Sequence, residues 1–334
     1  MNGLPEALKN RCLRFTRRAI LLGAAAAAAG SAWAAYPDRP IILIVPFAPG
    51  GSSDIIARTI APELSSLLGQ SIVVENTAGA GGVLGMTRAV RAAADGYSLL
   101  LGSGSEVLIN KLINPALQFD GLRDLKPVVF VGTGPMVLVG KKALPPNTVA
   151  ELITYAKDER NILNFASAGN GTPMHVGGEL FNLKAGTRIS HIPYRGASPA
   201  LVDVMGGQIE LGISTLTAAQ SFIKAGKIKA YGVLSREKSS LAPDIPAIGQ
   251  VPGLEAVDLG VWFGLFVPTK TPADVTGKLE AAARSVMANP EIIKKLAEQG
   301  VIASGESASK LNSFMALEVE KYRAVIKAAD IRPQ

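Results

Sequence analysis

The chain has 334 residues, with 34 Lys plus Arg against 27 Asp plus Glu, which gives a formal net charge of +7. A hydrophobic content of 48% and a charged content of 18% exclude a disordered chain, and the length suits one large or two medium-sized domains. One Cys and two His exclude a disulfide framework, a cysteine-rich zinc site and an iron–sulfur site.

Residues 1–34 have the pattern of an export signal. A basic start is followed by an apolar run from Ala19 to Ala29 and by Ala32-Trp33-Ala34, a small-x-small cleavage site. The run is far shorter than the roughly 20 residues that span a bilayer as a helix, so we expect cleavage near Ala34 rather than an uncleaved anchor. Arg17-Arg18 resembles a twin-arginine signal, which leaves the Sec and twin-arginine export routes both open.

The signal segment carries most of the positive charge. It holds five Lys or Arg and one acid, so the mature chain keeps a net charge of only +3 and no Cys. That charge, without a basic cluster interleaved with aromatics, is not typical of nucleic-acid binding. We therefore expect an exported, thiol-free globular protein located in the periplasm.

Short apolar runs, many of them apolar on both faces as buried parallel strands are, alternate with helical patterns along the mature chain. The expected strands are Ile41–Pro46, Ile72–Glu75, Ser98–Gly102, Val128–Val131, Met136–Gly140, Leu163–Ala166, Ile189–Pro193, Ile209–Ser214, Lys229–Leu234 and Gly264–Val267. The expected helix starts are Thr148 with Glu151, Ser198-Pro199, Thr271-Pro272 and Asn289-Pro290, and a last helix is expected from about Ala308 to Ala329.

Alternation of strands and helices predicts an α/β fold of doubly wound parallel sheets with helices on both faces. The number of strands exceeds what one sheet holds comfortably, which predicts two lobes. The candidate hinges are Ala143–Asn147, which is rich in Pro, and Gly260–Pro268.

Glycine-rich loops follow five of the expected strands, at the strand ends where open α/β sheets bind ligands. The loops are Pro46–Asp54, Asn76–Gly82, Gly102–Ser105, Ser167–Thr172 and Pro193–Ser198. Glycine lets main-chain N–H groups approach a ligand, and a helix N-terminus adds a partial positive charge. Because Arg195 is the one full positive charge in these loops, the expected ligand is a small carboxylate or similar oxyanion. The alternative is that these glycines only make turns.

Enzyme motifs are weak. Gly79-Ala80-Gly81 and Gly169-Asn170-Gly171 begin like a dinucleotide fingerprint but lack its third glycine, and Ser103 and Ser105 lack a Gly-x-Ser-x-Gly elbow. We therefore expect no catalytic residue, no cofactor and no metal. An exported hydrolase that uses Ser103 or Ser105 with a His remains the alternative, because His175 and His191 flank the last two loops.

Asp54 has two interpretations. In the first turn of a helix it offsets the helix dipole and can pair with Arg58, four residues on. Alternatively it faces a ligand ammonium group or orders a bridging water.

Several motifs occur together in a characteristic order. They are Tyr36–Pro40, Pro46–Asp54, Val74–Asn76 with Gly79–Gly82, Asp95–Tyr97, Ser167–Gly171, His191–Gly196, Gly206–Gln208 and Ala225–Lys227. In this order and spacing the mature chain resembles the Bug family, the periplasmic solute receptors of tripartite tricarboxylate transporters.

The resemblance implies a type II periplasmic-binding-protein fold of two α/β lobes joined by two crossing strands. The expected bounds are 35–140 plus 264–334 for one lobe and 141–263 for the other. It implies a monomeric receptor that closes by hinge motion on a small carboxylate and docks on membrane transporter subunits or a sensor kinase. An orphan sensor subunit is therefore an alternative to a transport receptor, and the sequence does not identify the ligand.

The resemblance also implies a ligand site with two walls. One wall would hold Phe47, Gly50, Gly51, Ser52, Ser53 and Asp54. The other would hold Ser167, Gly169, Asn170, Gly171, Thr172, Tyr194 and Gly196, and Ser103 in the third loop is a further candidate.

Overall fold

The computed structural model describes residues 36–333, and one compact unit begins at Arg39. The expected signal segment and its cleavage site lie outside the described residues. Within residues 36–333, no helix combines the length and the apolar character needed to cross a membrane.

The unit contains two sheets that share one strand. The first has the order β2-β1-β3-β9-β4, and β10 pairs with β4. Its strands are β1 (Ile41–Val45), β2 (Ile72–Asn76), β3 (Ser98–Ser103), β4 (Leu125–Lys141), β9 (Gly260–Pro268) and β10 (Ile302–Ser307). The second has the order β4-β7-β5-β6, with β8 also on β4, and adds β5 (Asn164–Ser167), β6 (Ser190–Pro193), β7 (Leu211–Thr215) and β8 (Ile228–Val233).

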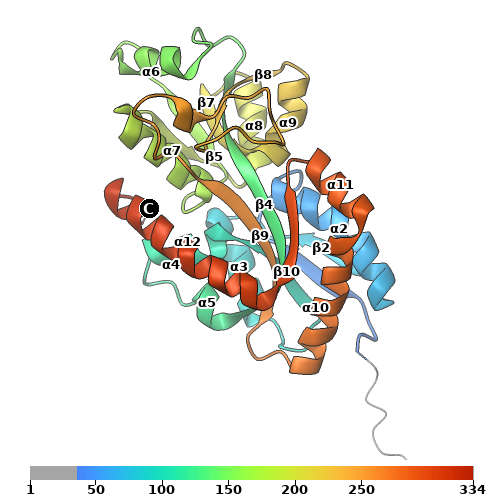
Figure 1. The fold of residues 1–334 in the computed structure, drawn as a ribbon. Coiled ribbons are helices and arrows are strands. Elements are labelled where there is room, and N and C mark those ends of the chain that lie inside the picture. Colours follow the sequence, from blue (N-terminus) through green and yellow to red (C-terminus); the bar gives the residue numbers. More distant parts are fainter. Residues whose placement is uncertain (1–35, 334) are drawn as a thin grey trace, which may run out of the picture. The chain divides into compact units, whose positions relative to one another are not determined.

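The shared strand β4 runs beside β9 and links the two sheets (Figure 1). Its first part, up to Pro135, pairs antiparallel with β9, and from Met136 on it pairs with β7 and β8. The sequence predicts two strands here, because Gly132, Gly134 and Pro135 disfavour a strand interior. The chain continues as one strand, since β9 supplies a partner along the whole interrupted stretch.

Each sheet is mixed rather than wholly parallel. The pairs β1–β2, β1–β3, β5–β6 and β5–β7 are parallel, whereas β9 and β10 run antiparallel to their neighbours. The antiparallel strands are those that connect the two sheets or pair with a connecting strand. The chain passes from the first sheet to the second along β4 and returns along β9, so these two strands run in opposite directions. The sequence does not predict β10, whose alternation is broken by Gly305.

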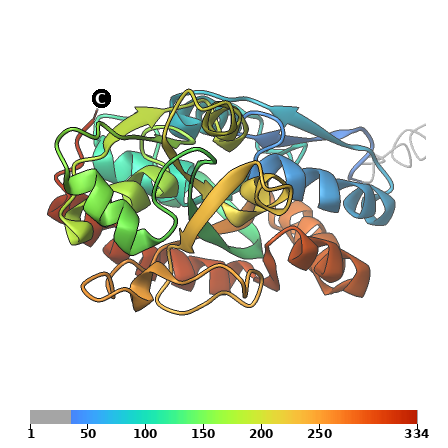
Figure 2. The ribbon, with the colours of Figure 1, turned by 90° about the horizontal axis from the view of Figure 1, so that it is seen from above.

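Helices cover both sheets. They are α2 (Ser52–Leu68), α3 (Val83–Arg91), α4 (Asn110–Ile113), α5 (Gly121–Asp124), α6 (Val149–Lys157), α7 (Pro173–Ala185), α8 (Ala197–Met205), α9 (Leu216–Lys224), α10 (Ala273–Ala288), α11 (Pro290–Glu298) and α12 (Ala308–Ala328), with three short turns η1 (Ala80–Gly82), η2 (Ser105–Ile109, a π-helix) and η3 (Ile248–Gln250). In both views α2 lies beside α10 and α11 (Figure 2).

Local signals place several helix ends correctly. Thr148 caps α6 by accepting a hydrogen bond from the N–H of Glu151, and Asn289 caps α11 with Pro290 at its first position. The start of α8 differs, because Gly196 rather than Ser198 is its N-cap. Position 196 suits only glycine, because its φ is +148° and main-chain atoms of Ala48 lie close by. The helix begins at Ala197, before the expected first residue Pro199.

Candidate functional site

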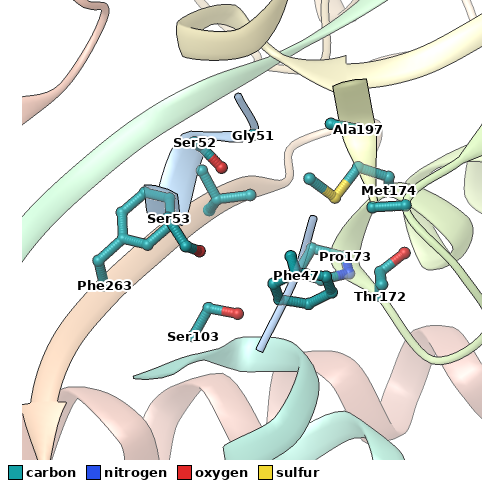
Figure 3. A pocket seen from close by; sticks show the side chains of 12 residues that line it. Phe47, Gly51, Ser52, Ser53, Ser103, Thr172, Pro173, Met174, Ala197 and Phe263 are labelled. Atoms are coloured by element: carbon teal, nitrogen blue, oxygen red, sulfur yellow. The ribbon is translucent and has the colours of Figure 1, made fainter. Parts of the chain in front are cut away.

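A cavity lies where loops of the two sheets meet (Figure 3). Its lining comprises Phe47, Gly51, Ser52, Ser53, Ser103, Ala168, Thr172, Pro173, Met174, Ala197, Val261 and Phe263. The first sheet and the crossing strand β9 contribute one side, and the loops before α7 and α8 contribute the other. Within the part of the chain that the structure describes, this lining holds no charged side chain.

Three helices begin at the cavity: α2 at Ser52, α7 at Pro173 and α8 at Ala197. The first N–H groups of a helix have no partner inside the helix, and the helix dipole places a partial positive charge there. Thr172 caps α7 with its own side chain, whereas the N-caps of α2 and α8, Gly51 and Gly196, make no side-chain cap. Each sheet therefore offers one uncapped helix N-terminus to the same cavity.

The cavity is narrow. The space open to the centre of a water-sized sphere is about 20 Å³. One water molecule needs roughly 10–15 Å³ on this measure. Entry of a solute with several carbon atoms therefore requires the walls to move apart.

The two sets of loops touch through main-chain atoms. A Cβ atom on Gly81 would lie 1.9 Å from the carbonyl oxygen of Asn170, which belongs to the other sheet. The hydroxyl of Ser105 donates to the carbonyl oxygens of Gly81, at 2.7 Å, and Gly171, at 3.1 Å. These contacts hold the loops of one sheet against those of the other, and glycine makes the approach possible.

Asp54 supports the first loop rather than lining the cavity. Its side chain is buried, and its carboxylate accepts hydrogen bonds from the N–H of Gly50 at 2.9 Å, from Arg58 at 3.0 Å and from Asn76 at 3.1 Å. Burial alone would raise the pKa of Asp54, but the hydrogen bonds from Arg58, Gly50 and Asn76 outweigh it and lower that pKa. The pairing with Arg58 follows the four-residue spacing expected from the sequence.

Ser103 joins the cavity to a buried acid. It ends β3, and its N–H donates to Oε1 of Glu106 at 2.5 Å, while its Oγ lies 3.0 Å from Oε2 of the same carboxyl. Glu106 is 0% exposed. Burial raises the pKa of Glu106 to about 8, although hydrogen bonds from its own N–H and from Ser103 act in the opposite direction.

This buried acid predicts a pH dependence of stability. Between about pH 4.5 and pH 8 the folded protein retains a proton on Glu106 that the unfolded chain has lost. The free energy of unfolding therefore falls as pH rises through this range and levels off above it. We expect Glu106→Gln, which keeps the shape and cannot ionise, to raise the free energy of unfolding at pH 7 by on the order of 1 to 3 kcal/mol.

Urea unfolding of both proteins at pH 4 to 9 measures this difference. The gap between variant and wild type should be smallest near pH 4 and widen up to pH 8. Parallel stability curves for the two proteins would contradict a buried, protonated Glu106.

The two histidines form a stacked pair, and among residues 36–333 neither ring makes a hydrogen bond to Ser103 or Ser105. Their ring centroids are 4.0 Å apart, and Nε2 of His191 lies 2.6 Å from Oγ of Ser167. Burial lowers the pKa of His175 to about 4, and burial together with the charge of His175 lowers that of His191 to about 3. Both rings are therefore neutral at ordinary pH.

The serines of the expected hydrolase have other partners. The hydroxyl of Ser103 contacts Glu106, and that of Ser105 contacts carbonyl oxygens. Ser167, which does contact a His, is 0% exposed. No group of three His, Cys, Asp or Glu among residues 36–333 could hold a metal ion.

The structure distributes the expected site residues over two positions. Phe47, Gly51, Ser52, Ser53, Ser103 and Thr172 line the cavity. Eight further expected residues are not part of that lining: Gly50, Asp54, Ser167, Gly169, Asn170, Gly171, Tyr194 and Gly196. That any of them binds a ligand stays a prediction.

Tyr194 shows how a loop residue turns away from the cavity. Its hydroxyl donates to Oδ2 of Asp203 at 2.6 Å. Burial and the neighbouring Asp203 carboxylate raise the pKa of Tyr194 to about 12. The hydroxyl therefore contacts the second half of α8, and Tyr194 is not among the residues that line the cavity.

Sequence reasoning missed the apolar part of the lining. These residues are Ala168, Pro173, Met174, Ala197, Val261 and Phe263. Met174 and Phe263 resemble ordinary core residues in the sequence, and Phe263 is 2% exposed. Two signals were available: Ala168 and Ala197 fall in the expected ligand loops Ser167–Thr172 and Pro193–Ser198, and Val261 and Phe263 fall in the expected hinge segment Gly260–Pro268.

Two α/β sheets joined by crossing strands, with a cavity between their loops, define the class of type II periplasmic solute-binding proteins. The family model described as "Tripartite tricarboxylate transporter family receptor" matches residues 56–331. The chain belongs to this family, and it is a periplasmic receptor of the Bug type.

Relatives that align with nearly the whole chain support this family assignment. The chain is 35% identical over 321 residues to a UPF0065 protein of Bordetella pertussis, with 96% of this chain and 98% of the relative covered. It is 34% identical over 320 residues to protein BugT of the same organism, with coverages of 94% and 98%.

Solved structures of similar proteins also support the assignment. The periplasmic binding protein BugD is 31% identical, with a TM-score of 0.83, covering 90% of this chain and 100% of that one. Rpa4515 of R. palustris with adipate is 30% identical, with a TM-score of 0.84 and coverages of 90% and 100%. MatC of Rhodopseudomonas palustris with bound malate is 30% identical, with a TM-score of 0.82 and coverages of 87% and 100%.

Proposed function

We propose that this protein binds a small organic acid in the cavity between its two sheets and delivers it to a tripartite tricarboxylate-type transporter. The observation that carries the proposal is the pair of uncapped helix N-termini, at Gly51 and Gly196, one on each side of the cavity. A carboxylate oxygen can accept hydrogen bonds from the free N–H groups there.

The charge and polarity of the lining favour a small acid. Without a cationic side chain in the described lining, the site lacks the charge that a polyphosphate needs. Hydroxyls of Ser52 and Ser53 add polar partners, while Met174 and Phe263 offer apolar surface for a carbon chain. The solved relatives with adipate and with malate hold acids of this kind.

Access and retention of the solute require hinge motion. We assign residues 35–140 plus 264–334 to one lobe and residues 141–263 to the other, with β4 and β9 as the connecting strands. The partners of β4 change at Pro135–Met136, shortly before this boundary, and a bend there would allow the hinge motion. A ligand that contacts both lobes binds the closed form better than the open form, and this difference drives closure.

The proposed function also includes a membrane partner that recognises the closed form of the receptor. The family description supports docking on the membrane subunits of a transporter, and docking on a sensor kinase would use the same closed shape. In both cases the receptor acts as a monomer and is not an enzyme. The hydroxyls of Ser103 and Ser105 contact Glu106 and carbonyl oxygens instead of a histidine, which speaks against the hydrolase alternative.

Calorimetric titration and thermal unfolding with adipate and with malate test the proposal. Each acid is paired with an uncharged control of similar size, hexane-1,6-diol for adipate and glycerol for malate. We expect at least one acid to bind, and at a hundredfold excess over its Kd to raise the free energy of unfolding by about 2.7 kcal/mol. The uncharged controls should have no effect, because they do not complement the helix N-termini.

Further small mono-, di- and tricarboxylates extend the screen. If none of the acids shifts the unfolding transition, the proposal fails. If the purified protein hydrolyses simple esters and His191→Ala abolishes that activity, the hydrolase alternative replaces it.

A further inference from the structure

The hydrogen-bond pair of Ser103 and Glu106 has a definite proton arrangement. Oε1 of Glu106 accepts from the N–H of Ser103, so the remaining contact joins Oε2 of Glu106 to Oγ of Ser103 at 3.0 Å. A serine hydroxyl carries one proton, and an ionised carboxylate can only accept. The charge of Glu106 therefore decides which of the two oxygens supplies the proton in this contact.

The two charge states present different groups to the cavity. When Glu106 is ionised, the Ser103 hydroxyl must donate to Oε2, and it turns only lone pairs toward a ligand. When Glu106 is protonated, its O–H donates to Ser103, and the serine proton is free to point into the cavity. A carboxylate ligand is therefore attracted when Glu106 is protonated and repelled when Glu106 is ionised.

We propose that Glu106 is a positioning residue that makes the Ser103 hydroxyl a hydrogen-bond donor to the bound carboxylate as long as Glu106 is protonated. This inference rests on the function proposed above. It adds that anion binding is linked to one proton on a group that the ligand itself does not touch.

The surroundings of Glu106 keep this proton in place. Among residues 36–333 its side chain has hydrogen-bond partners only in Ser103 and in its own N–H. The elements packed against η2 bring the titratable groups Arg88 and Arg91 from α3, Lys111 from α4, Arg123 and Asp124 from α5, and, on the buried side of α12, Glu318 and Tyr322.

Among these groups Arg91 is exposed and Glu318 pairs with Lys321. Arg123 pairs with Asp124, Arg88 pairs with Glu75, and the ammonium group of Lys111 donates to carbonyl oxygens of its own loop. Without a cation to stabilise the carboxylate, full burial favours the neutral acid. The pKa of about 8 that burial gives Glu106 agrees with a protonated group at neutral pH. A bound carboxylate nearby favours the proton further.

The test measures the affinity for adipate, or for malate if malate binds more tightly, as a function of pH. Both acids are fully ionised above pH 7, so the ligand does not titrate in the range used. We expect the Kd of the wild type to rise about tenfold from pH 7 to pH 9, as expected for one linked group with a pKa near 8. Glu106→Gln, whose amide donates to Ser103 at every pH, should change less than threefold over that range.

Three further measurements separate this role from a structural one. At pH 8.5, titrations in buffers of different ionisation enthalpy should show proton uptake on binding in the wild type and none in Glu106→Gln. Ser103→Ala should weaken binding about tenfold at pH 7 and remove the pH dependence. Glu179→Gln is the control, because burial also raises the pKa of Glu179, and this variant should keep the wild-type profile.

Each outcome has one meaning. Equal pH profiles for the wild type and Glu106→Gln would overturn the inference while leaving the proposed function intact. Loss of binding in folded Glu106→Gln at both pH values would also overturn it, because the amide supplies the same donor. Failure of both acids to bind the wild type at any pH would count against the proposed function itself.

Discussion

Gly81→Ala is expected to lower the affinity for a carboxylate ligand by at least a hundredfold while leaving the protein folded. The added Cβ would lie 1.9 Å from the carbonyl oxygen of Asn170, a distance that real Cβ atoms do not show. The obstructing atom belongs to the main chain, so a side-chain rotation cannot relieve the clash. The loops of the two sheets would have to separate, which disfavours the form that grips the ligand.

A matched control distinguishes this clash from backbone strain. Gly81 has φ +60°, where an L-residue costs roughly 1–2 kcal/mol, and Gly226 has φ +63° with no atom within 4 Å of its added Cβ. Gly226→Ala should therefore be destabilised about equally and bind normally. Gly171→Ala should have an intermediate effect, because its Cβ would meet the amide oxygen of the Asn110 side chain, which can rotate.

Calorimetry and small-angle scattering measure the two consequences. The wild type should bind the ligand and become more compact, whereas Gly81→Ala should show neither effect. Normal affinity in Gly81→Ala would mean that the contact with Asn170 is unrelated to ligand binding.

Gly51→Val is expected to abolish ligand binding with little loss of stability. Gly51 has φ −79°, which valine adopts readily, and its added Cβ would meet only the carbonyl oxygen of Ala48, at 3.4 Å. The valine methyl groups would then enter a cavity with room for about one water molecule, and would cover the N-terminus of α2. The ligand loses both the space and the N–H donors of one wall.

The measurement is calorimetric titration together with thermal unfolding. Gly277→Val, on α10 with open space around its Cβ, is the control and should bind as the wild type does. An unchanged affinity in Gly51→Val would show that the assigned wall is wrong, whatever the outcome for Gly81→Ala.

Local sequence signals predicted most of the secondary structure. Thr148 and Asn289-Pro290 mark the starts of α6 and α11, and the last helix was expected within one residue of its observed end. These features depend on a few adjacent residues: a side chain that caps free N–H groups, or a proline that fits the first turn. They do not depend on how the elements pack.

Long-range pairing decided the features that the sequence missed. The strand β4 continues through Gly132 and Pro135 because β9 pairs alongside, and β10 exists because β4 offers it an edge. Position 196, the N-cap of α8, requires glycine because Ala48, far away in the sequence, lies against it. Local propensity carries no information about such partners.

The features of the candidate site also fall into two groups, those that the sequence determined and those that only the tertiary structure decided. The sequence by itself determined the glycine-rich loops, because they follow from residue types at strand ends. Only the tertiary structure brought Gly81 against Asn170, placed Met174 and Phe263 in the lining, and set Glu106 behind Ser103. These contacts depend on the distances between loops and on burial from water, which arise only when both sheets are packed around the shared strand.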